Sequence, residues 1–328
     1  MRTPRHDTPG VEWSPSTEAT APMGPDRSQP EPYPQTCPAC GGELGIDGYC
    51  LTCGQKARSL REHYELEPVS WLAGVCDIGQ LHARNEDALM CAAQGDRAVV
   101  VVCDGVTTSQ DSDLASMAAA KAACQVLWTN NPQGLGTPAS RASAVAAVIT
   151  QAVAAANEAV IDQTDPASPN SAATTIALAV IDGSTAYCAN VGDSRVYWLP
   201  DEGEPQQMTK DHSLAQDGMD LGTGRAEAES SAMAHTITKW LGRDATDISP
   251  NMATLDIDIA GWLLVCSDGL WNYVSEAADL RSTVVPLVAD QPTARQLAAR
   301  LVDWANRAGG HDNITVACAR LQGHDCDD

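Results

Sequence analysis

Short acidic motifs lie beside strand-like apolar runs at five places along this 328-residue chain. In four of the five, the apolar run meets the acid directly or within two residues. Each motif alone is ordinary turn chemistry, because Asp and Gly are common in turns. Strand ends are rigid, however, so five such acids together favour one site at one edge of a sheet structure. The motifs are Asn85-Glu86-Asp87, Cys103-Asp104-Gly105, Gly192-Asp193-Ser194-Arg195, Ser267-Asp268-Gly269 and His311-Asp312-Asn313.

The carboxylates of these motifs indicate a site for hard divalent cations. Mg²⁺ and Mn²⁺ prefer oxygen ligands and tolerate retained waters. Two such ions can share a carboxylate at a separation of about 3.5 to 4 Å, lower the pKa of a bridging water and hold it for in-line attack on phosphorus. The pattern therefore predicts a metal-dependent hydrolase.

Runs of strands alternate with runs of helices, which predicts an α+β fold with antiparallel sheets. Short apolar runs between turn residues indicate strands, and apolar residues at three- and four-residue spacing indicate helices. Predicted strands cover residues 69–79, 87–93, 97–105, 174–182, 184–192, 194–203, 252–260, 262–269 and 314–321. Predicted helices cover about residues 113–128, 139–161, 275–280 and 293–306, and residues 212–233 have weak helical character.

Two CxxC pairs, separated by nine residues, form a cluster near the N-terminus at Cys37, Cys40, Cys50 and Cys53. Tight CxxC turns can direct four thiolates at one zinc ion, with each sulfur at about 2.3 Å. A site with four Cys ligands has no open position, so we expect one structural zinc in a small ribbon. A more specific hypothesis is that the ribbon also forms a docking or regulatory surface. The remaining alternative is that the four cysteines are redox-active and bind no zinc.

The charge balance argues against nucleic acid as the main partner. The chain has 20 Lys and Arg against 43 Asp and Glu, for a formal net charge of −23, whereas binding a phosphate backbone relies on cationic side chains. No run approaches the roughly 20 apolar residues that cross a bilayer, so we also expect no membrane partner. The first ten residues, MRTPRHDTPG, do not form an apolar signal segment, which predicts a cytoplasmic protein with reduced cysteines.

Composition shifts divide the chain into five parts. Residues 1–36 hold 8 of the 19 prolines and predict a disordered tail. The expected zinc ribbon covers residues 37–54, a charged linker covers 55–68, the main domain covers 69–322 and an acidic tail covers 323–328.

Six stretches between about residues 70 and 321 resemble, in order, the motifs of the metal-dependent Ser/Thr protein phosphatases of the PPM or type 2C family, bacterial type. The resemblance implies an α-β-β-α sandwich of two antiparallel sheets with helices on both outer faces. The stretches are DIGQLHARNEDAL, VVVVCDG, TTIALAVIDGSTAYCANVGDSRVYWL, MTKDHS, WLLVCSDGLWN and GGHDNITVACARL.

The same resemblance implies roles for the acidic motifs. Asp104 would bridge two metal ions, and the Gly105 carbonyl and Glu86 would help to hold one of them. Asp268 and Asp312 would hold the other.

Two further acids have weaker roles by this resemblance. Asp87 would support the site through water or indirect contacts, and Asp193 matches a ligand of a third, weaker ion in bacterial relatives.

The chain departs from the family pattern where substrate phosphate binds. Relatives carry an Arg four residues before Glu86, and this chain has His82 there. Arg84 would share a face with His82 and Glu86 in an extended segment, so either residue is a candidate for the phosphate contact.

Two other departures concern the loops around the site. The segment Val106-Thr107-Thr108-Ser109 lacks both a Gly pair and the His found in eukaryotic members, so no general acid is assigned. Lys239 stands where relatives often have Arg. Residues 213–235 correspond to a variable flap beside the metal cleft, and their glycines predict either a mobile substrate-sensing loop or a plain surface loop.

The leading hypothesis is a cytoplasmic phosphatase that hydrolyses phosphoserine and phosphothreonine in proteins with two or three Mn²⁺ or Mg²⁺ ions and a metal-bridged hydroxide. Its expected partners are phosphoproteins, including Ser/Thr kinases, and the oligomeric state stays open. A weakly active phosphoprotein-binding or sensor module that recruits partners through the ribbon is the first alternative. A phosphodiesterase or nuclease fits the carboxylates but not the negative charge.

Overall fold

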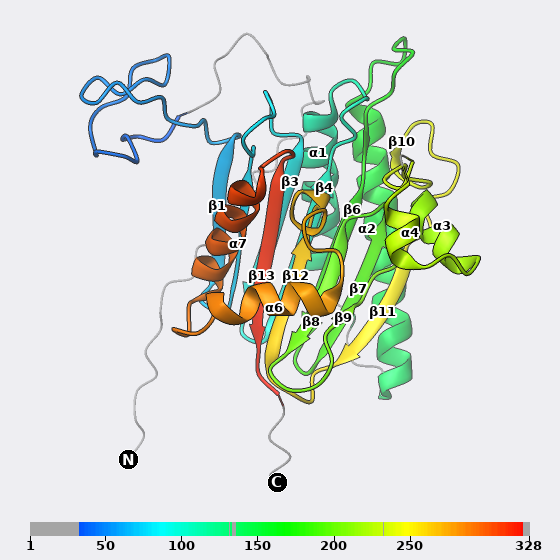
Figure 1. Ribbon diagram of the computed structural model, residues 1–328. Helices are drawn as coiled ribbons and strands as arrows, with labels where there is room; N and C mark the ends of the chain where they lie inside the picture. Colours follow the sequence, from blue (N-terminus) through cyan, green and yellow to red (C-terminus); the bar gives the residue numbers. More distant parts are fainter. Residues whose placement is uncertain (1–32, 131, 133–135, 232, 324–328) are drawn as a thin grey trace. The chain divides into compact units, whose positions relative to one another are not determined.

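The computed structural model describes residues 33–130, 132, 136–231 and 233–323 (Figure 1). Most of the expected Pro-rich tail, and all of the acidic tail except Gly323, lie outside the described residues.

Two antiparallel sheets form the centre of the described part. One has six strands in the order β1-β2-β13-β12-β8-β9, and the other has five in the order β11-β7-β6-β4-β3. The strands of the first sheet are β1 (His63–Val69), β2 (Leu72–Asp77), β13 (Ile314–Leu321), β12 (Gly261–Cys266), β8 (Arg195–Pro200) and β9 (Gln206–Gln207). Those of the second are β11 (Asn251–Asp256), β7 (Thr185–Val191), β6 (Ile176–Asp182), β4 (Arg97–Asp104) and β3 (Asp87–Gln94). A separate short pair joins β5 (Ala173–Thr174) to β10 (Leu241–Gly242).

Helices cover the outer face of each sheet, so the fold has four layers (Figure 1). Helices α1 (Ser112–Thr129) and α2 (Pro138–Asp162) pack on the five-stranded sheet. Helices α6 (Ala277–Leu287) and α7 (Ala294–Ala308) pack on the six-stranded sheet. The α-β-β-α sandwich expected from the sequence is therefore confirmed.

Aliphatic residues make up most of the three large apolar clusters of the described residues, and the chain has no Phe to contribute. Between the sheets, alternate residues of the paired strands meet, as the period of two in a strand requires. These include Leu89, Val100, Ala179, Cys188 and Val265, all at most 1% exposed. The short side chains of α1 allow it to lie close to the sheet, since Ala115, Ala119 and Ala123 are fully buried.

The sheet begins earlier than the sequence predicted. Strand β1 begins inside the segment 55–68, which was expected to be a linker, and it pairs with β2 at the edge of the six-stranded sheet. Its alternating charged residues Glu65 and Glu67 hide the strand pattern. Charged side chains of this kind are usual on edge strands, where they discourage pairing with other chains.

Three short helices lie near the strand ends. Helix α5 (Asp268–Trp271) follows β12 directly, and α3 (Leu214–Asp220) and α4 (Arg225–Glu229) lie in the expected flap. Helix α6 begins two residues after the predicted start and continues to Leu287 with Pro286 inside it. The other predicted helices agree with the structure within two residues at each end.

Helix α2 has the length and composition of a helix that could cross a membrane, with a mean hydropathy of 1.6 over its most apolar 18 residues. The sequence analysis had expected no such segment. One helix of this kind is weak evidence of a membrane span, because helices in protein cores pass the same test. Here Val145, Ile149 and Val153 of α2 are buried in the core against the five-stranded sheet.

Candidate metal centre

Five of the predicted acids lie at strand ends. Asp87 begins β3 and is paired with Asp104, the last residue of β4. Asp193 lies between the end of β7 and the start of β8, Asp268 is the first residue of α5 after β12, and Asp312 precedes β13. Neighbouring strands run antiparallel, so the end of one and the start of the next meet at the same edge.

Four of these carboxylates, those of Asp87, Asp104, Asp193 and Asp268, have raised pKa values to which the charges of neighbouring acids contribute. Burial raises the pKa of Asp87 to about 7, and the charges of Asp312 and Asp268 add to the rise. Burial and Asp312 raise the pKa of Asp268 to about 6. Burial also raises the pKa of Asp104 and of Asp193 well above the ordinary value, with Asp268 contributing to both. Asp87 is paired with Asp104 across the ladder, and Asp104 is in hydrogen-bonding contact with Asp268. We call Asp87, Asp104, Asp193, Asp268 and Asp312, all at strand ends, the carboxylate cluster.

The donor set of this cluster fits divalent cations. Carboxylate oxygens are the ligands that Mg²⁺ and Mn²⁺ prefer. Crowding buried anions is unfavourable unless a positive charge compensates them, and a bound cation supplies that charge.

Glu86 is adjacent to the cluster in sequence, but its carboxylate binds elsewhere. Its Oε1 atom accepts a hydrogen bond of 2.7 Å from Arg84 Nη2 and another from Ser112 Oγ. Burial opposes ionisation of Glu86, yet the hydrogen bonds from Ser112 and Arg84 lower its pKa. In this structure Glu86 is therefore neutralised by Arg84, and its role as a metal ligand stays a prediction.

The two candidates for phosphate binding are both paired with acids. His82 Nε2 lies 3.2 Å from Asp312 Oδ1, at the border of the carboxylate cluster. Arg84 contacts Glu86 and also places Nη1 3.3 Å from Asp113 Oδ1, while 44% of its side chain stays exposed. His82 is thus next to the cluster, whereas the side chain of Arg84 is paired with Glu86 and Asp113, which are not members of the cluster.

Glycines follow two of the acids for a reason other than turn geometry. A Cβ atom on Gly269 would lie 1.9 Å from the carbonyl oxygen of Asn313, and one on Gly105 would lie 2.6 Å from that of Ser112. Neither glycine has a positive φ. The Asp-Gly pairs thus allow neighbouring backbones to approach the acids closely, which the sequence analysis did not foresee.

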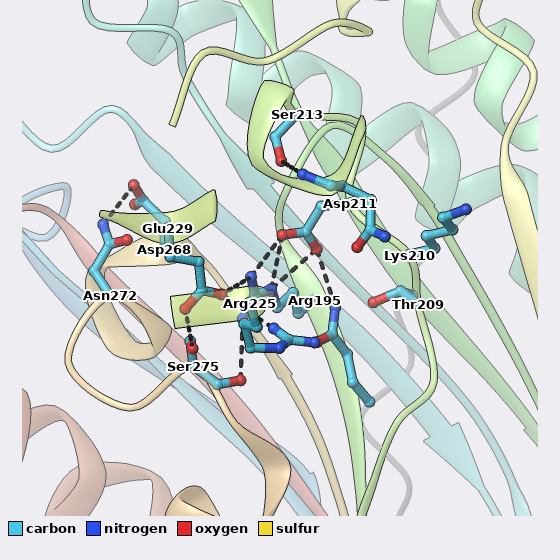
Figure 2. Close-up of polar contacts among 12 residues, drawn as sticks. Arg195, Thr209, Lys210, Asp211, Ser213, Arg225, Glu229, Asp268, Asn272 and Ser275 are labelled. Carbon is cyan, nitrogen blue, oxygen red and sulfur yellow. Dashed lines mark hydrogen bonds and ion pairs between the residues drawn. The ribbon is translucent and has the colours of Figure 1, made fainter. Parts of the chain in front are cut away.

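Amide side chains hold the acids in place. Asn272 Nδ2 donates to Asp268 Oδ2 at 2.9 Å, as Figure 2 shows. Asn313 Oδ1 accepts from the Glu86 backbone N–H at 2.7 Å, while its Nδ2 donates to the carbonyls of Ile78 and Arg84. Asn313 therefore ties the segment before β3 to the segment that carries Asp312.

A buried ion pair that the sequence analysis missed supports the same region (Figure 2). Arg195 and Asp211 are joined by three hydrogen bonds of 2.6 to 3.0 Å, and the Arg195 guanidinium stacks on Trp271 at 3.6 Å. Asp193 lies two residues before Arg195, and Asp268 lies three before Trp271. The pair thus joins two strand ends that carry cluster acids, and only folding brings Arg195 and Asp211 together.

The flap is attached to this ion pair. Glu229 of α4 lies 3.8 Å from Arg195, receives a hydrogen bond of 2.8 Å from Ser275 Oγ and is paired with Arg225 (Figure 2). A cavity of about 330 Å³ lies beside these contacts and is lined by Glu229, Trp271 and Asn272, among others.

The four ribbon cysteines lie together, as the spacing predicted. Their sulfur atoms are all within 4.8 Å of one another, with Cys37 and Cys53 at 3.7 Å and Cys40 and Cys50 at 3.5 Å. Zinc–sulfur bonds of about 2.3 Å in a tetrahedron require sulfur atoms about 3.8 Å apart. The cluster therefore fits one zinc ion, and its thiols are free of disulfides.

A family model described as protein phosphatase 2C matches residues 80–306. The protein phosphatase PhpP of Streptococcus pneumoniae is 36% identical over 153 residues, which are 46% of this chain and 58% of that protein. The Ser/Thr protein phosphatase PstP of Mycobacterium tuberculosis is 29% identical over 252 residues, or 76% of this chain and 44% of that protein. The chain thus spans about half the length of these curated relatives.

Solved structures of bacterial phosphatases share the fold. The M. tuberculosis phosphatase PstP/Ppp superposes with a TM-score of 0.61 and 28% identity, covering 76% of this chain and 98% of that one. The catalytic domain of PstP, solved in complex with two manganese ions, gives a TM-score of 0.58 and 26% identity, covering 76% and 97%. The Streptococcus agalactiae Ser/Thr phosphatase, at 24% identity and a TM-score of 0.65, covers 79% and 100% and supports the fold alone.

Mn²⁺ should stabilise this protein more at pH 7.5 than at pH 5. The folded-state pKa values of Asp87, about 7, and Asp268, about 6, lie above 3.8, the ordinary value for Asp. Without cations the folded state then binds more protons than the unfolded state between about pH 4 and 7, so stability falls as the pH rises through this window. Mn²⁺ relieves the repulsion, and the rise in Tm that it causes should be several degrees larger at the higher pH. Thermal melts with and without Mn²⁺ at both pH values measure this, and equal rises would contradict the cluster as a cation site.

Proposed function

The chain belongs to the protein phosphatase 2C family, and we propose that it removes phosphate from phosphoserine and phosphothreonine in proteins with two Mn²⁺ or Mg²⁺ ions. The observation that carries the proposal is the carboxylate cluster, in which acids from five separate motifs lie at the ends of strands of both sheets, with Asp87 paired directly with Asp104. The relative that is named a Ser/Thr protein phosphatase, PstP, supports the same reaction.

Asp104, Asp268 and Asp312 would hold the ions, with Asp87 and Asp193 beside them. When bound, divalent ions supply positive charge to the phosphate and lower the pKa of the attacking water.

The protein's own side chains orient these ligands. Asn272 fixes one oxygen of Asp268, and Ser267 Oγ donates to Asp87 Oδ2 at 2.7 Å. The imidazole of His82 next to Asp312 is in position to meet a substrate phosphate or to hold a proton at Nε2.

The negative charge of the chain bears on the choice of substrate. A formal charge of −23 repels free phosphate, so the bound cations must supply the local attraction. Phosphoproteins with basic residues near the phosphorylated site should therefore be favoured. Ser/Thr kinases and their targets are the partners we propose, in the cytoplasm, where free thiols such as those of this chain persist.

One observation favours the alternative of a phosphoprotein-binding module with weak activity. Both phosphate-binding candidates, His82 and Arg84, are engaged by acids in the structure. Tight binding of Mn²⁺ and a phosphopeptide without turnover would distinguish this module from the enzyme.

We expect purified protein to hydrolyse a phosphothreonine peptide and p-nitrophenyl phosphate in Mn²⁺, and to lose that activity in EDTA. Asp104→Ala should lower kcat by roughly 10³-fold, because metal ions contribute several kcal/mol of transition-state stabilisation. Asp303→Ala is the matched control, since Asp303 is an exposed acid on α7 and should leave the rate unchanged. Equal rates with Mn²⁺, with EDTA and in the Asp104 variant would end the proposal.

If Arg84 meets the phosphate, Arg84→Ala should raise KM for a phosphopeptide by about 10-fold or more, as expected for loss of a charged hydrogen bond worth about 1.5 to 3 kcal/mol. His82→Ala, assayed beside it, shows which of the two residues makes the contact. Arg281→Ala serves as the control, because Arg281 is a half-buried arginine that bonds the Asp201 and Gly203 carbonyls. An unchanged KM in Arg84→Ala excludes this residue from phosphate binding.

A further inference from the structure

In the described part of the chain, no loop separates the zinc ribbon from the segment that contacts the backbone around the carboxylate cluster. Within the ribbon, Cys50 N–H donates to the Gln55 carbonyl at 2.9 Å, and Ala57 N–H donates to the Gly48 carbonyl at 2.8 Å. Ala57 is buried, and the next residue, Arg58, already contacts the phosphatase fold. Residues 58–63, which we call the clamp segment, are therefore positioned from one side by the ribbon.

Arg58 at the start of the clamp segment holds the turn after β2. It pairs with the buried carboxylate of Asp77, and its Nη2 donates to the Gly79 carbonyl at 3.2 Å. His63 Nδ1 lies 2.7 Å from the same carboxylate. Burial opposes the charge on Asp77, yet the hydrogen bonds from His63 and Arg58 bring its pKa down to about 2.

That turn packs directly on the strand end that carries Asp312. Gly79 has a φ of +77°, and a Cβ atom there would lie 2.1 Å from the Asp312 carbonyl oxygen. Its backbone N–H donates to Asp77 Oδ1 at 2.9 Å. The Arg58–Asp77 pair thus fixes a backbone that touches the Asp312 backbone.

Arg61 holds the backbone of Asp87 and the start of α1. Its Nη1 donates to the Asp87 carbonyl at 2.5 Å, and its Nη2 donates to the Asp113 carbonyl in the first turn of α1 at 3.2 Å. In return, the buried Asn85 donates from Nδ2 to the Arg61 carbonyl at 3.1 Å and accepts from the Asp87 N–H. One arginine therefore fixes the backbone of Asp87 and joins it to α1.

The clamp segment has its own local fold. Ser59 N–H donates to Glu62 Oε2 at 2.6 Å, and Glu62 N–H donates to Ser59 Oγ at 3.1 Å. This reciprocal pair resembles a capping box and fixes the turn that presents Arg61.

The ribbon itself has little apolar core to hold it in shape. Ile46 and Leu51 are 96% and 70% exposed, and Cys37, Cys50 and Ala57 are its buried apolar residues. Small domains of this kind obtain their folding free energy from the metal that they bind. The position of the clamp segment should therefore depend on zinc.

We propose that zinc in the ribbon raises the affinity of the carboxylate cluster for Mn²⁺ through the clamp segment, with Arg61 and Arg58 as positioning residues. The inference rests on the proposed metal-dependent function. A ribbon that only docks partners would leave Mn²⁺ affinity unchanged when its zinc is lost.

The test measures Mn²⁺ binding to the full chain by calorimetry, with zinc content and thermal melts recorded for each sample. Cys40→Ser with Cys53→Ser removes the two exposed ligands and leaves the contacts of the phosphatase fold in place. Arg61→Ala removes the side chain that bonds the Asp87 and Asp113 carbonyls, and Arg61→Lys keeps a positive charge at this position. Arg300→Ala, whose arginine pairs with Asp290 on the surface, is the matched control.

Zinc loss and Arg61→Ala should each weaken Mn²⁺ binding by about 10- to 100-fold, the usual cost of removing a group that orients metal ligands. Arg61→Lys should recover part of the affinity, and Arg300→Ala should lose none. The cysteine and Arg61 changes together should weaken binding no further than zinc loss alone, because zinc acts through the clamp segment that carries Arg61.

Unchanged Mn²⁺ affinity in the zinc-free variant overturns the inference, as does full additivity of the two changes. Failure of the proposed function looks different. Wild-type protein would then bind Mn²⁺ in a zinc-dependent way and release no phosphate from a phosphopeptide.

Discussion

Mutual repulsion among closely spaced, partly buried carboxylates is the constraint on which the rest of this structure depends. Burial and neighbouring charges raise the pKa of Asp87, Asp104, Asp193 and Asp268, so the ionised cluster opposes folding unless cations are present. Such a cluster lowers the stability of the folded protein, and ligand binding is the function that accounts for its presence. The repulsion that lowers the stability of the cation-free protein therefore also favours the binding of cations.

The scaffold holds these charges in place by surrounding them with fixed polar contacts. Asn313 ties the loop before β3 to the start of β13, and the buried Arg195–Asp211 pair connects β8 to the segment before the flap. Glycines 79, 105 and 269 let neighbouring backbones approach within distances that no Cβ would permit. Each contact opposes the outward movement of strand ends that the repulsion favours.

Local sequence was enough to predict most of the long strands and the acids at their ends, because strand patterns and turn residues are encoded locally, whereas the four layers followed from the resemblance to the phosphatase family. Strand β1 was missed because edge strands carry charges that mask their period of two. The Arg195–Asp211 pair and the attachment of Glu86 to Arg84 could not be predicted, since they depend on which side chains folding brings together. The same holds for the contacts of Arg58 and Arg61, which lie in a segment that the sequence indicated to be a linker.

The central claim is that acids from five motifs form one divalent-cation centre. Crystals grown with Mn²⁺ and measured at the manganese absorption edge test it most directly. The account predicts two anomalous peaks about 3.5 to 4 Å apart, both within bonding distance of Asp104, with Asp268 and Asp312 on one of them. No manganese peak at these strand ends, in crystals that hold Mn²⁺ in their mother liquor, would contradict it.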